Sequence, residues 1–312
     1  MVAIIVHGGA GVLRGSHNLE RYRVFLGISA EKGYAILKSG GSALDGVMTA
    51  VYEMEECGEF NAGSGCVLTL DGYAELDAGV MDGQTLSTGA VGCVREVRHP
   101  VLGARFVMEK TDHVLLVGDG AQRFLEANGI LRDSSLITTE KLEKLQRLKR
   151  EWFDGKSGRL QKNRSWYRRM HGTVGAVAVD SQGRVAAAVS TGGYWLKMSG
   201  RVGDSAVAGA GFYANHTGGA VATGTGEIAI KEGLARKTVE ALEAGLSPEE
   251  ASKRSIENVS RKYGEGTMGL IVLDSKGEIG YAYNTQGMGR AWIQSGRDSP
   301  FVGVFPEDNP RM

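Results

Sequence analysis

Long apolar runs are missing from this chain. No stretch approaches the ~20 consecutive apolar residues that a membrane-spanning helix needs. Residues 1–7 are MVAIIVH, without a basic region and with only a short apolar run. We therefore expect no signal peptide and no membrane association, and we predict a cytoplasmic protein.

Cysteine and net charge are also scarce. The three cysteines, Cys57, Cys66 and Cys93, are odd in number and match no zinc-binding spacing, which favours a reducing compartment. The 36 basic and 36 acidic side chains cancel. A neutral chain has no general attraction to nucleic acid or to anionic membranes.

Several familiar catalytic motifs are absent. The chain has no Gly-x-Ser-x-Gly motif and no His-Glu-x-x-His motif, and no Walker lysine follows the glycines after residue 7. No histidine in the sequence is a convincing partner for a cysteine nucleophile. Serine and threonine hydroxyls remain as candidate nucleophiles.

Glycine is abundant instead. It occupies 47 of the 312 positions, about twice its usual share, which predicts many turns and close backbone contacts. The length suffices for a sizeable core in one large domain or two smaller ones. Apolar patterning predicts alternating strands and helices. We expect strands over 2–6, 86–97, 113–117, 173–179, 184–191, 219–223, 268–274 and 278–283, and helices over 18–38, 42–56, 100–110, 121–128, 227–244 and 247–263.

Two further segments have local signals. The His7-Gly8-Gly9-Ala10-Gly11 stretch favours a tight turn, with an anion-binding turn as the alternative. Residues 66–80 resemble a hairpin around Asp71-Gly72.

A charged segment divides the chain. Residues 140–170 contain eleven Lys or Arg against four acids, with aromatic residues between them. Such a mixture is found in nucleic-acid patches, but a solvated linker with a short helix at its start is the simpler interpretation.

Thr173 follows this linker directly and opens an alternating strand. An N-terminal threonine carries its own base, because its α-amine is partly neutral near pH 7 and can accept the hydroxyl proton. This chemistry requires cleavage of the Gly172–Thr173 bond. An ordinary strand threonine is the competing interpretation from local residues alone.

Six motifs, in order, resemble those of the plant-type asparaginase and isoaspartyl peptidase family of N-terminal nucleophile (Ntn) hydrolases. They are His7-Gly8-Gly9-Ala10-Gly11, Phe60-Asn61-Ala62-Gly63, Gly172-Thr173-Val174-Gly175-Ala176-Val177-Ala178, Ser190-Thr191-Gly192-Gly193, Gly200-Arg201-Val202-Gly203-Asp204-Ser205 and Thr223-Gly224-Thr225-Gly226-Glu227.

The resemblance implies an α+β fold, a four-layer αββα sandwich, that is cut into two subunits. Residues 1–172 would form the α subunit, with a C-terminal linker from about 131, and residues 173–312 the β subunit. The two subunits together form one domain and assemble as (αβ)₂. The implied reactions are hydrolysis of L-asparagine and of β-aspartyl (isoaspartyl) dipeptides.

The resemblance also implies residue roles. Thr173 is the nucleophile, with Thr191 beside it and Asn61 supporting it. Thr223 and Gly224 form the oxyanion hole. Arg201 can bind the substrate α-carboxylate through its two-pronged guanidinium, and Asp204 can bind the α-ammonium; an exposed Arg–Asp pair would contribute little.

No cofactor is implied for catalysis, but the family places a structural sodium ion on backbone carbonyls. The matching residues are Met54, Glu55, Cys57, Phe60, Ala62 and Ser64.

One departure from the family pattern stands out. Tyr194-Trp195-Leu196 replaces a smaller, more polar segment, and we expect it to shape the leaving-group side of the site.

Three alternative functions remain open. They are a glycosylasparaginase, a threonine endopeptidase of the same superfamily, and a non-catalytic module that binds anions or nucleic acid.

Overall fold

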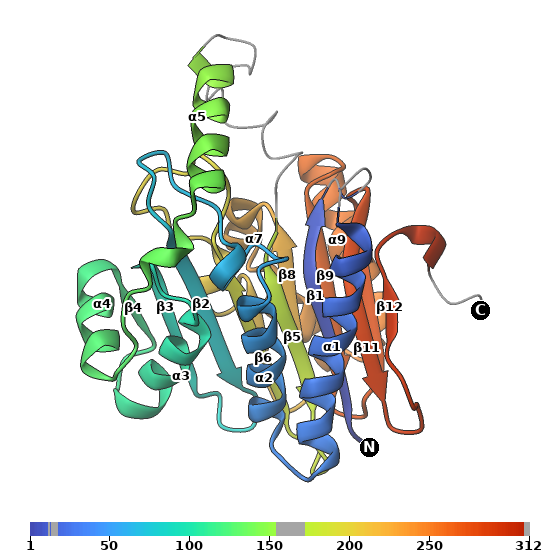
Figure 1. Ribbon diagram of the computed structural model, residues 1–312. Coiled ribbons are helices and arrows are strands. Elements are labelled where there is room, and N and C mark those ends of the chain that lie inside the picture. The colour runs from blue at the N-terminus through green and yellow to red at the C-terminus, as the bar shows by residue number, and fades with distance from the viewer. Residues whose placement is uncertain (12, 14–17, 154–171, 309–312) are drawn as a thin grey trace.

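The computed structural model describes residues 1–11, 13, 18–153 and 172–308 (Figure 1). Strands in these ranges form two sheets. The eight-stranded sheet has the order β12 (Phe301–Gly303), β11 (Gly287–Gln294), β1 (Ala3–Gly11), β5 (Val174–Val179), β6 (Val185–Thr191), β2 (Glu75–Asp82), β3 (Thr88–Arg95) and β4 (Leu115–Val117). The four-stranded sheet has the order β10 (Ile279–Tyr283), β9 (Met268–Asp274), β8 (Gly218–Gly224) and β7 (Phe212–Ala214).

Helices pack on the outer sides of both sheets. The α-helices are α1 (Leu19–Lys38), α2 (Ala43–Glu56), α3 (Pro100–Lys110), α4 (Gly118–Ala127), α5 (Thr139–Phe153), α7 (Gly226–Glu232), α8 (Leu234–Glu243) and α9 (Pro248–Tyr263). Short 3₁₀ helices are η1 (Gly63–Gly65), η2 (Ser134–Leu136), η3 (Asp204–Ala206) and η4 (Pro306–Asp308). None of the helices within the described ranges is both long and apolar enough to cross a bilayer.

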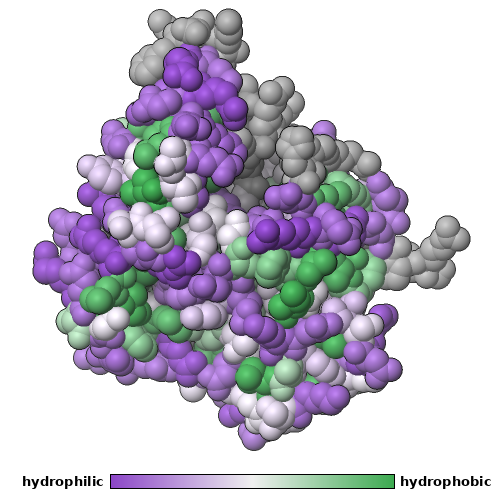
Figure 2. All heavy atoms as spheres, viewed as in Figure 1, coloured by the Kyte–Doolittle hydropathy of each residue, from purple (hydrophilic) through white to green (hydrophobic). Residues whose placement is uncertain are grey.

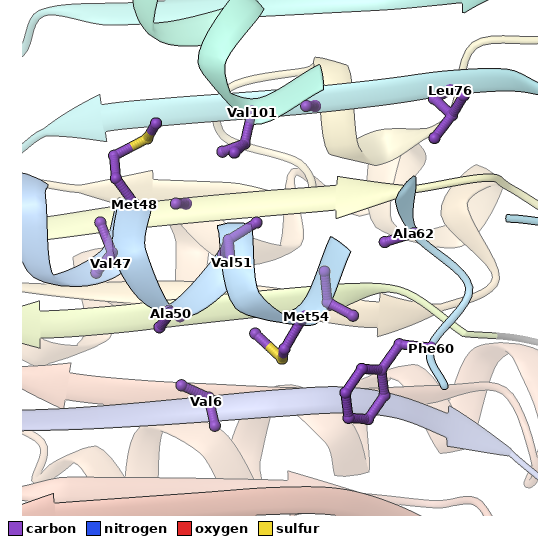
Figure 3. Packing of buried hydrophobic residues seen from close by; sticks show 14 of the residues in the cluster. Val6, Val47, Met48, Ala50, Val51, Met54, Phe60, Ala62, Leu76 and Val101 are labelled. Atoms are coloured by element: carbon purple, nitrogen blue, oxygen red, sulfur yellow. The ribbon is translucent and has the colours of Figure 1, made fainter. Parts of the chain in front are cut away.

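Three buried clusters hold these layers together. One lies between the eight-stranded sheet and helices α1–α4, and Figure 3 shows Val51 and Met54 of α2 packing over the strands. A second lies between the two sheets, and a third lies between the four-stranded sheet and α8 and α9. Burying this much apolar surface is the main stabilising contribution to the fold.

Strand β5, which follows Thr173, is buried on both faces. Ala176 and Ala178 of β5 belong to the cluster under the helices. Val177 and Val179 belong to the cluster between the sheets. Alternate side chains of a strand point to opposite faces, so β5 contributes to both cores and holds the backbone near Thr173 rigidly.

Many expected elements are confirmed. Helix α3 has its predicted bounds, and Ser42 caps α2 by accepting a hydrogen bond from the Asp45 amide. Helix α9 begins with a capping box between Ser247 and Glu250. The hairpins β5–β6 and β9–β10 are antiparallel pairs, as predicted.

Three local expectations are wrong. Residues His7 to Gly11 continue β1 with a bulge after His7 and do not form a turn. Residues 66–70 form no strand, and β2 pairs with β3 and β6 instead of closing a hairpin at Asp71. The helix expected over 227–244 is divided at Gly233, whose φ of +58° lies in the left-handed region.

The charged linker begins with a helix longer than expected. Helix α5 runs to Phe153 and projects from the top of the view in Figure 1. Its surface in Figure 2 is mainly hydrophilic. The rest of the segment, residues 154–171, lies outside the described part of the chain, and with it most of the basic and aromatic mixture.

Candidate functional site

Thr173 lies at the start of β5, buried beside a second threonine. Its hydroxyl donates a hydrogen bond of 3.3 Å to Thr191 Oγ1 at the end of β6. Antiparallel pairing of the two strands places Val174 opposite Ser190. The hydroxyls meet because both threonines lie at the same end of this hairpin.

The carbonyl that precedes Thr173 is held by two donors. Asn61 Nδ2 donates to Gly172 O at 2.7 Å, and Thr191 Oγ1 donates to the same oxygen at 3.1 Å. The Gly193 amide in turn donates to Thr191 Oγ1 at 2.9 Å. Thr191 Oγ1 therefore accepts a hydrogen bond from the Thr173 hydroxyl and donates one to Gly172 O. The three groups form a short chain of hydrogen bonds along which a proton can move.

Asn61 is fixed in the loop after α2. Its Oδ1 accepts from the Val67 amide at 3.0 Å, and its Nδ2 also donates to Gly193 O at 2.5 Å. Neighbouring Phe60 packs edge-on against Tyr22, with ring centroids 4.9 Å apart. These contacts orient the amide toward the bond between residues 172 and 173.

The end of β1 contacts both Gly172 and Thr223. Gly9 has a φ of +118°, and a Cβ at this position would lie 2.8 Å from Gly172 Cα, so only glycine fits here. The next amide, that of Ala10, donates to Thr223 Oγ1 at 3.2 Å. Since the Thr223 oxygen already accepts this bond, its hydroxyl proton remains available as a donor.

Arg201 lies in the loop before η3, and Asp204 is the first residue of η3. A Cβ on Gly226 would lie 2.6 Å from Asp204 Oδ1 and 2.8 Å from Arg201 Nη2, so both groups contact the start of α7. The loop also adjoins Gly193, whose amide binds Thr191, because Arg201 Nη1 lies 3.4 Å from the Cβ position of Gly193. The structure thus brings the predicted catalytic and substrate-binding residues into one region.

Glu227 is a site residue that sequence reasoning missed. Its Oε1 accepts a hydrogen bond from Arg201 Nε at 3.1 Å and forms an ion pair with Arg201 Nη2 at 3.0 Å. Its Oε2 and Asp204 Oδ2 are both buried and have no hydrogen-bond partner among the described residues. Glu227 is the last residue of the sixth motif, and this position was the one feature of the sequence that could have indicated a place in the site.

The charges at the site are strongly perturbed. Burial raises the pKa of Asp204 to about 7, partly opposed by the charge of Arg201. Burial also lowers the pKa of the Arg201 guanidinium, but nearby carboxylates, Glu227 foremost, outweigh this effect and raise its pKa overall. Arg201 is therefore a permanent cation beside a carboxyl group that titrates near neutrality.

His7 is a second residue whose place was missed. It is fully buried on β1, and a Cβ on Gly175 would lie 2.6 Å from its Nε2. Burial lowers the pKa of His7 to about 3, against a weaker opposing effect of the Thr173 backbone. The imidazole is thus neutral and lies opposite Gly175 of the neighbouring strand β5, where sequence reasoning saw only a glycine-rich turn.

The segment Tyr194-Trp195-Leu196 contacts Arg201, one of the predicted substrate-binding residues. The Arg201 guanidinium lies over the Tyr194 ring, 4.7 Å from its centroid. Trp195 is buried, and Lys144 of α5 lies 5.2 Å from its ring centroid. The aromatic pair therefore connects the linker helix with Arg201.

The residues implied for a cation lie at the end of α2 and in the following loop. The Glu55 and Phe60 carbonyls pack against Gly63 and Gly65. Ser64 O accepts a 2.8 Å hydrogen bond from Lys141 Nζ of α5. Within the described ranges no three His, Cys, Asp or Glu side chains gather around a metal position.

The comparison with known proteins identifies the family. The family model described as asparaginase matches residues 1–302, and the chain belongs to this family. The chain is 44% identical over 310 residues to a plant-type L-asparaginase of Pyrococcus abyssi, covering 97% of this chain and all of the relative.

Two further relatives extend this result. The chain is 44% identical over 316 residues to an isoaspartyl peptidase of Escherichia coli, covering 97% of this chain and 96% of the relative. It is 40% identical over 309 residues to an isoaspartyl peptidase/L-asparaginase of Xenopus laevis, covering 98% and 96%. Both activities are therefore represented among close relatives.

Proposed function

We propose that the protein is a self-activating amidohydrolase that converts L-asparagine to L-aspartate and ammonia and cleaves β-aspartyl dipeptides. One observation carries this proposal. The buried Thr173 hydroxyl bonds Thr191, and Thr191 and Asn61 both donate to the carbonyl of the bond that must break. The family and the printed names of its relatives support the substrate class.

Activation begins at that carbonyl. Thr173 Oγ1 attacks the Gly172 carbon, its proton passes to Thr191 Oγ1, and the Thr191 proton moves to the Gly172 oxygen. Collapse breaks the C–N bond, moves that proton to the departing nitrogen, and leaves an ester on Thr173. One water hydrolyses the ester, freeing the Gly172 carboxylate and the Thr173 α-amine.

Turnover then uses the freed amine as the base. It takes the proton of Thr173 Oγ1, which attacks the side-chain amide carbon of the substrate. The oxyanion accepts from the Thr223 hydroxyl and the Gly224 amide, an arrangement in which one lost donor typically costs ~10²–10³ in rate. The amine passes this proton to the leaving nitrogen, and ammonia or an amino acid departs. The same amine then takes a proton from water, which hydrolyses the β-aspartyl ester to L-aspartate and restores the Thr173 hydroxyl.

Substrate recognition rests on opposite charges a few residues apart. The guanidinium of Arg201 binds the α-carboxylate, and the carboxylate of Asp204 binds the α-ammonium. The free oxygens of Asp204 and Glu227 support this assignment, because an ammonium ion supplies the donors that they lack.

The surrounding organisation belongs to the same proposal. We infer a four-layer αββα sandwich of the Ntn-hydrolase type, an (αβ)₂ assembly and a cytoplasmic location. Two sheets with helices outside them and three separate cores support the layering. No nucleic-acid partner is proposed, because the net charge is zero.

A structural sodium ion in the loop over 54–64 remains a proposal. Backbone carbonyl oxygens suit a monovalent cation, and Ser64 O already accepts a hydrogen bond from a cation, the Lys141 ammonium. The test compares thermal unfolding in sodium chloride and in choline chloride at equal ionic strength. A sodium-specific, saturable rise in melting temperature supports the ion, whereas equal temperatures in both salts contradict it.

The decisive experiment for the function is a denaturing gel with the Thr173→Ala variant beside the wild type. The wild type should yield pieces of 172 and 140 residues (312 − 172 = 140), the second beginning at Thr173. The variant should stay full-length and inactive. An intact and fully active wild-type chain would overturn the proposal.

Substrates separate the family branches. We expect activity on L-asparagine and on a β-aspartyl-leucine dipeptide. Hydrolysis of a glycosylated asparagine without dipeptide cleavage would instead indicate a glycosylasparaginase.

A further inference from the structure

Lys197 is buried beside the substrate-binding loop, and the chemistry proposed above does not use it. Its side chain is 1% exposed, which is rare for lysine unless the charge is paired. Its Nζ donates to Glu75 O on β2 at 2.7 Å. A lysine in this position needs an electrostatic reason, because burying an unpaired ammonium is costly.

The Lys197 ammonium adjoins Arg201. A Cβ on Gly193 would lie 3.1 Å from Lys197 Nζ and 3.4 Å from Arg201 Nη1, so both cations flank this glycine. Two like charges repel each other. The ammonium therefore disfavours movement of the guanidinium toward Gly193 and leaves it facing Glu227, which binds its other edge.

Two buried carboxylates of β2 complete the arrangement. Asp77 Oδ2 accepts from the Gly203 amide at 2.8 Å, and Glu75 Oε2 accepts from the Gly200 amide at 2.9 Å. These two amides bracket Arg201 in the chain. Burial lowers the pKa of Lys197, and the charge of Asp77 is the largest opposing influence. The ammonium thus balances the carboxylates that fasten both ends of the Arg201 loop.

We propose that Lys197 is a positioning residue that holds the Arg201 guanidinium toward the α-carboxylate of the substrate. The inference rests on the proposed function, since it assumes that Arg201 binds that carboxylate. Lys197 itself touches no reacting atom. Its removal should weaken binding of ligands that carry the α-carboxylate and spare ligands that lack it.

Three inhibitors related to the product isolate this effect. L-aspartate carries both α-groups, succinate lacks the α-ammonium, and β-alanine lacks the α-carboxylate. In Lys197→Met, we expect the inhibition constants of L-aspartate and succinate to rise about tenfold, which corresponds to 1.4 kcal/mol. The constant of β-alanine and kcat should change less than about twofold, well under that energy.

Controls keep the outcomes separate. Lys276→Met, in the exposed turn between β9 and β10, should leave all three constants unchanged. An equal rise for all three inhibitors, or no rise for any, would overturn the role of Lys197.

If Lys197→Met does not self-cleave, Asp77→Asn is measured instead, with the same selective loss expected. A wild type that neither hydrolyses L-asparagine nor is inhibited by L-aspartate would refute the proposed function itself.

Discussion

At the scale of single residues, Asp204 is buried and is proposed to bind the substrate ammonium. Asp204→Asn keeps the shape of the side chain but removes its charge. We expect kcat/KM for L-asparagine to fall roughly 30- to 5000-fold, because the substrate ammonium loses its buried partner. This fall corresponds to a loss of about 2–5 kcal/mol of transition-state binding. Steady-state kinetics measure this loss. The exposed Asp112→Asn is the matched control, and equal kinetics in both variants would contradict the assignment.

The pH dependence follows from the same carboxyl group. The pKa of Asp204 is raised to about 7 by burial, so its charged form is lost as the pH falls through neutrality. We expect kcat/KM, which reports the free enzyme, to decline below about pH 7. The Thr173 α-amine, as the proposed base, adds an acid limb of its own. In Asp204→Asn one of the two protonations should be lost, so the limb should become less steep. An unchanged limb in that variant would assign the titration to another group.

At the scale of elements, the break between α7 and α8 depends on one glycine. Gly233 has a φ of +58°, and an added Cβ would meet nothing within 4 Å. The cost of Gly233→Ala is therefore conformational, about 1–2 kcal/mol of folding free energy. Chemical denaturation measures it.

A second glycine provides the control for that prediction. Gly120 lies inside α4, has no positive φ and also has open space around it. Gly120→Ala should therefore stabilise the protein by up to about 1 kcal/mol, since alanine favours helix more than glycine does. Equal effects of the two substitutions would contradict the left-handed conformation of Gly233.

Helix α5 is tied to the loop that supports Asn61. Lys141 Nζ donates to Ser64 O and to Leu136 O, each at 2.8 Å. Lys141→Met should lower the free energy of unfolding by about 1.5–3 kcal/mol, the usual contribution of hydrogen bonds that involve a charged group. The exposed Arg150→Met on the same helix is the control, and a loss of the same size there would refute the specific role of Lys141.

Periodicity was reliable where one strong signal marks an element. Pro100 at the first turn and the Ser247 capping box placed α3 and α9 well. Periodicity failed where a single residue adopts a backbone conformation that ends the helix although the apolar pattern continues. The apolar pattern over 227–244 continues across Gly233, so nothing in the pattern reveals that the helix axis changes there.

At the scale of the whole molecule, the two predicted subunits are interleaved. Strand β1 lies between β11 and β5, so a strand from residues 1–172 pairs on both sides with strands from residues 173–312. Strand β2 likewise pairs with β6. We expect the two pieces to stay together after cleavage, because separation would break central strand pairs and open the cores.

Native mass spectrometry and a denaturing gel of one sample test this expectation. The native mass should contain both pieces, and the gel should separate them. Release of either piece under native conditions would contradict the interleaved sheet. Thr173→Ala, which should not be cut, supplies the reference for an intact chain.

The sequence alone determined the nucleophile candidate and the family, because six motifs in a fixed order are specific even though each is weak. It also determined the alternation that buries both faces of β5. Only the tertiary structure determined which residues of those motifs contact one another. Thr191 and Asn61 converge on Gly172 O, Glu227 binds Arg201, and Lys197 lies beneath the same loop. These contacts join residues far apart in the chain, and local periodicity carries no information about such distances.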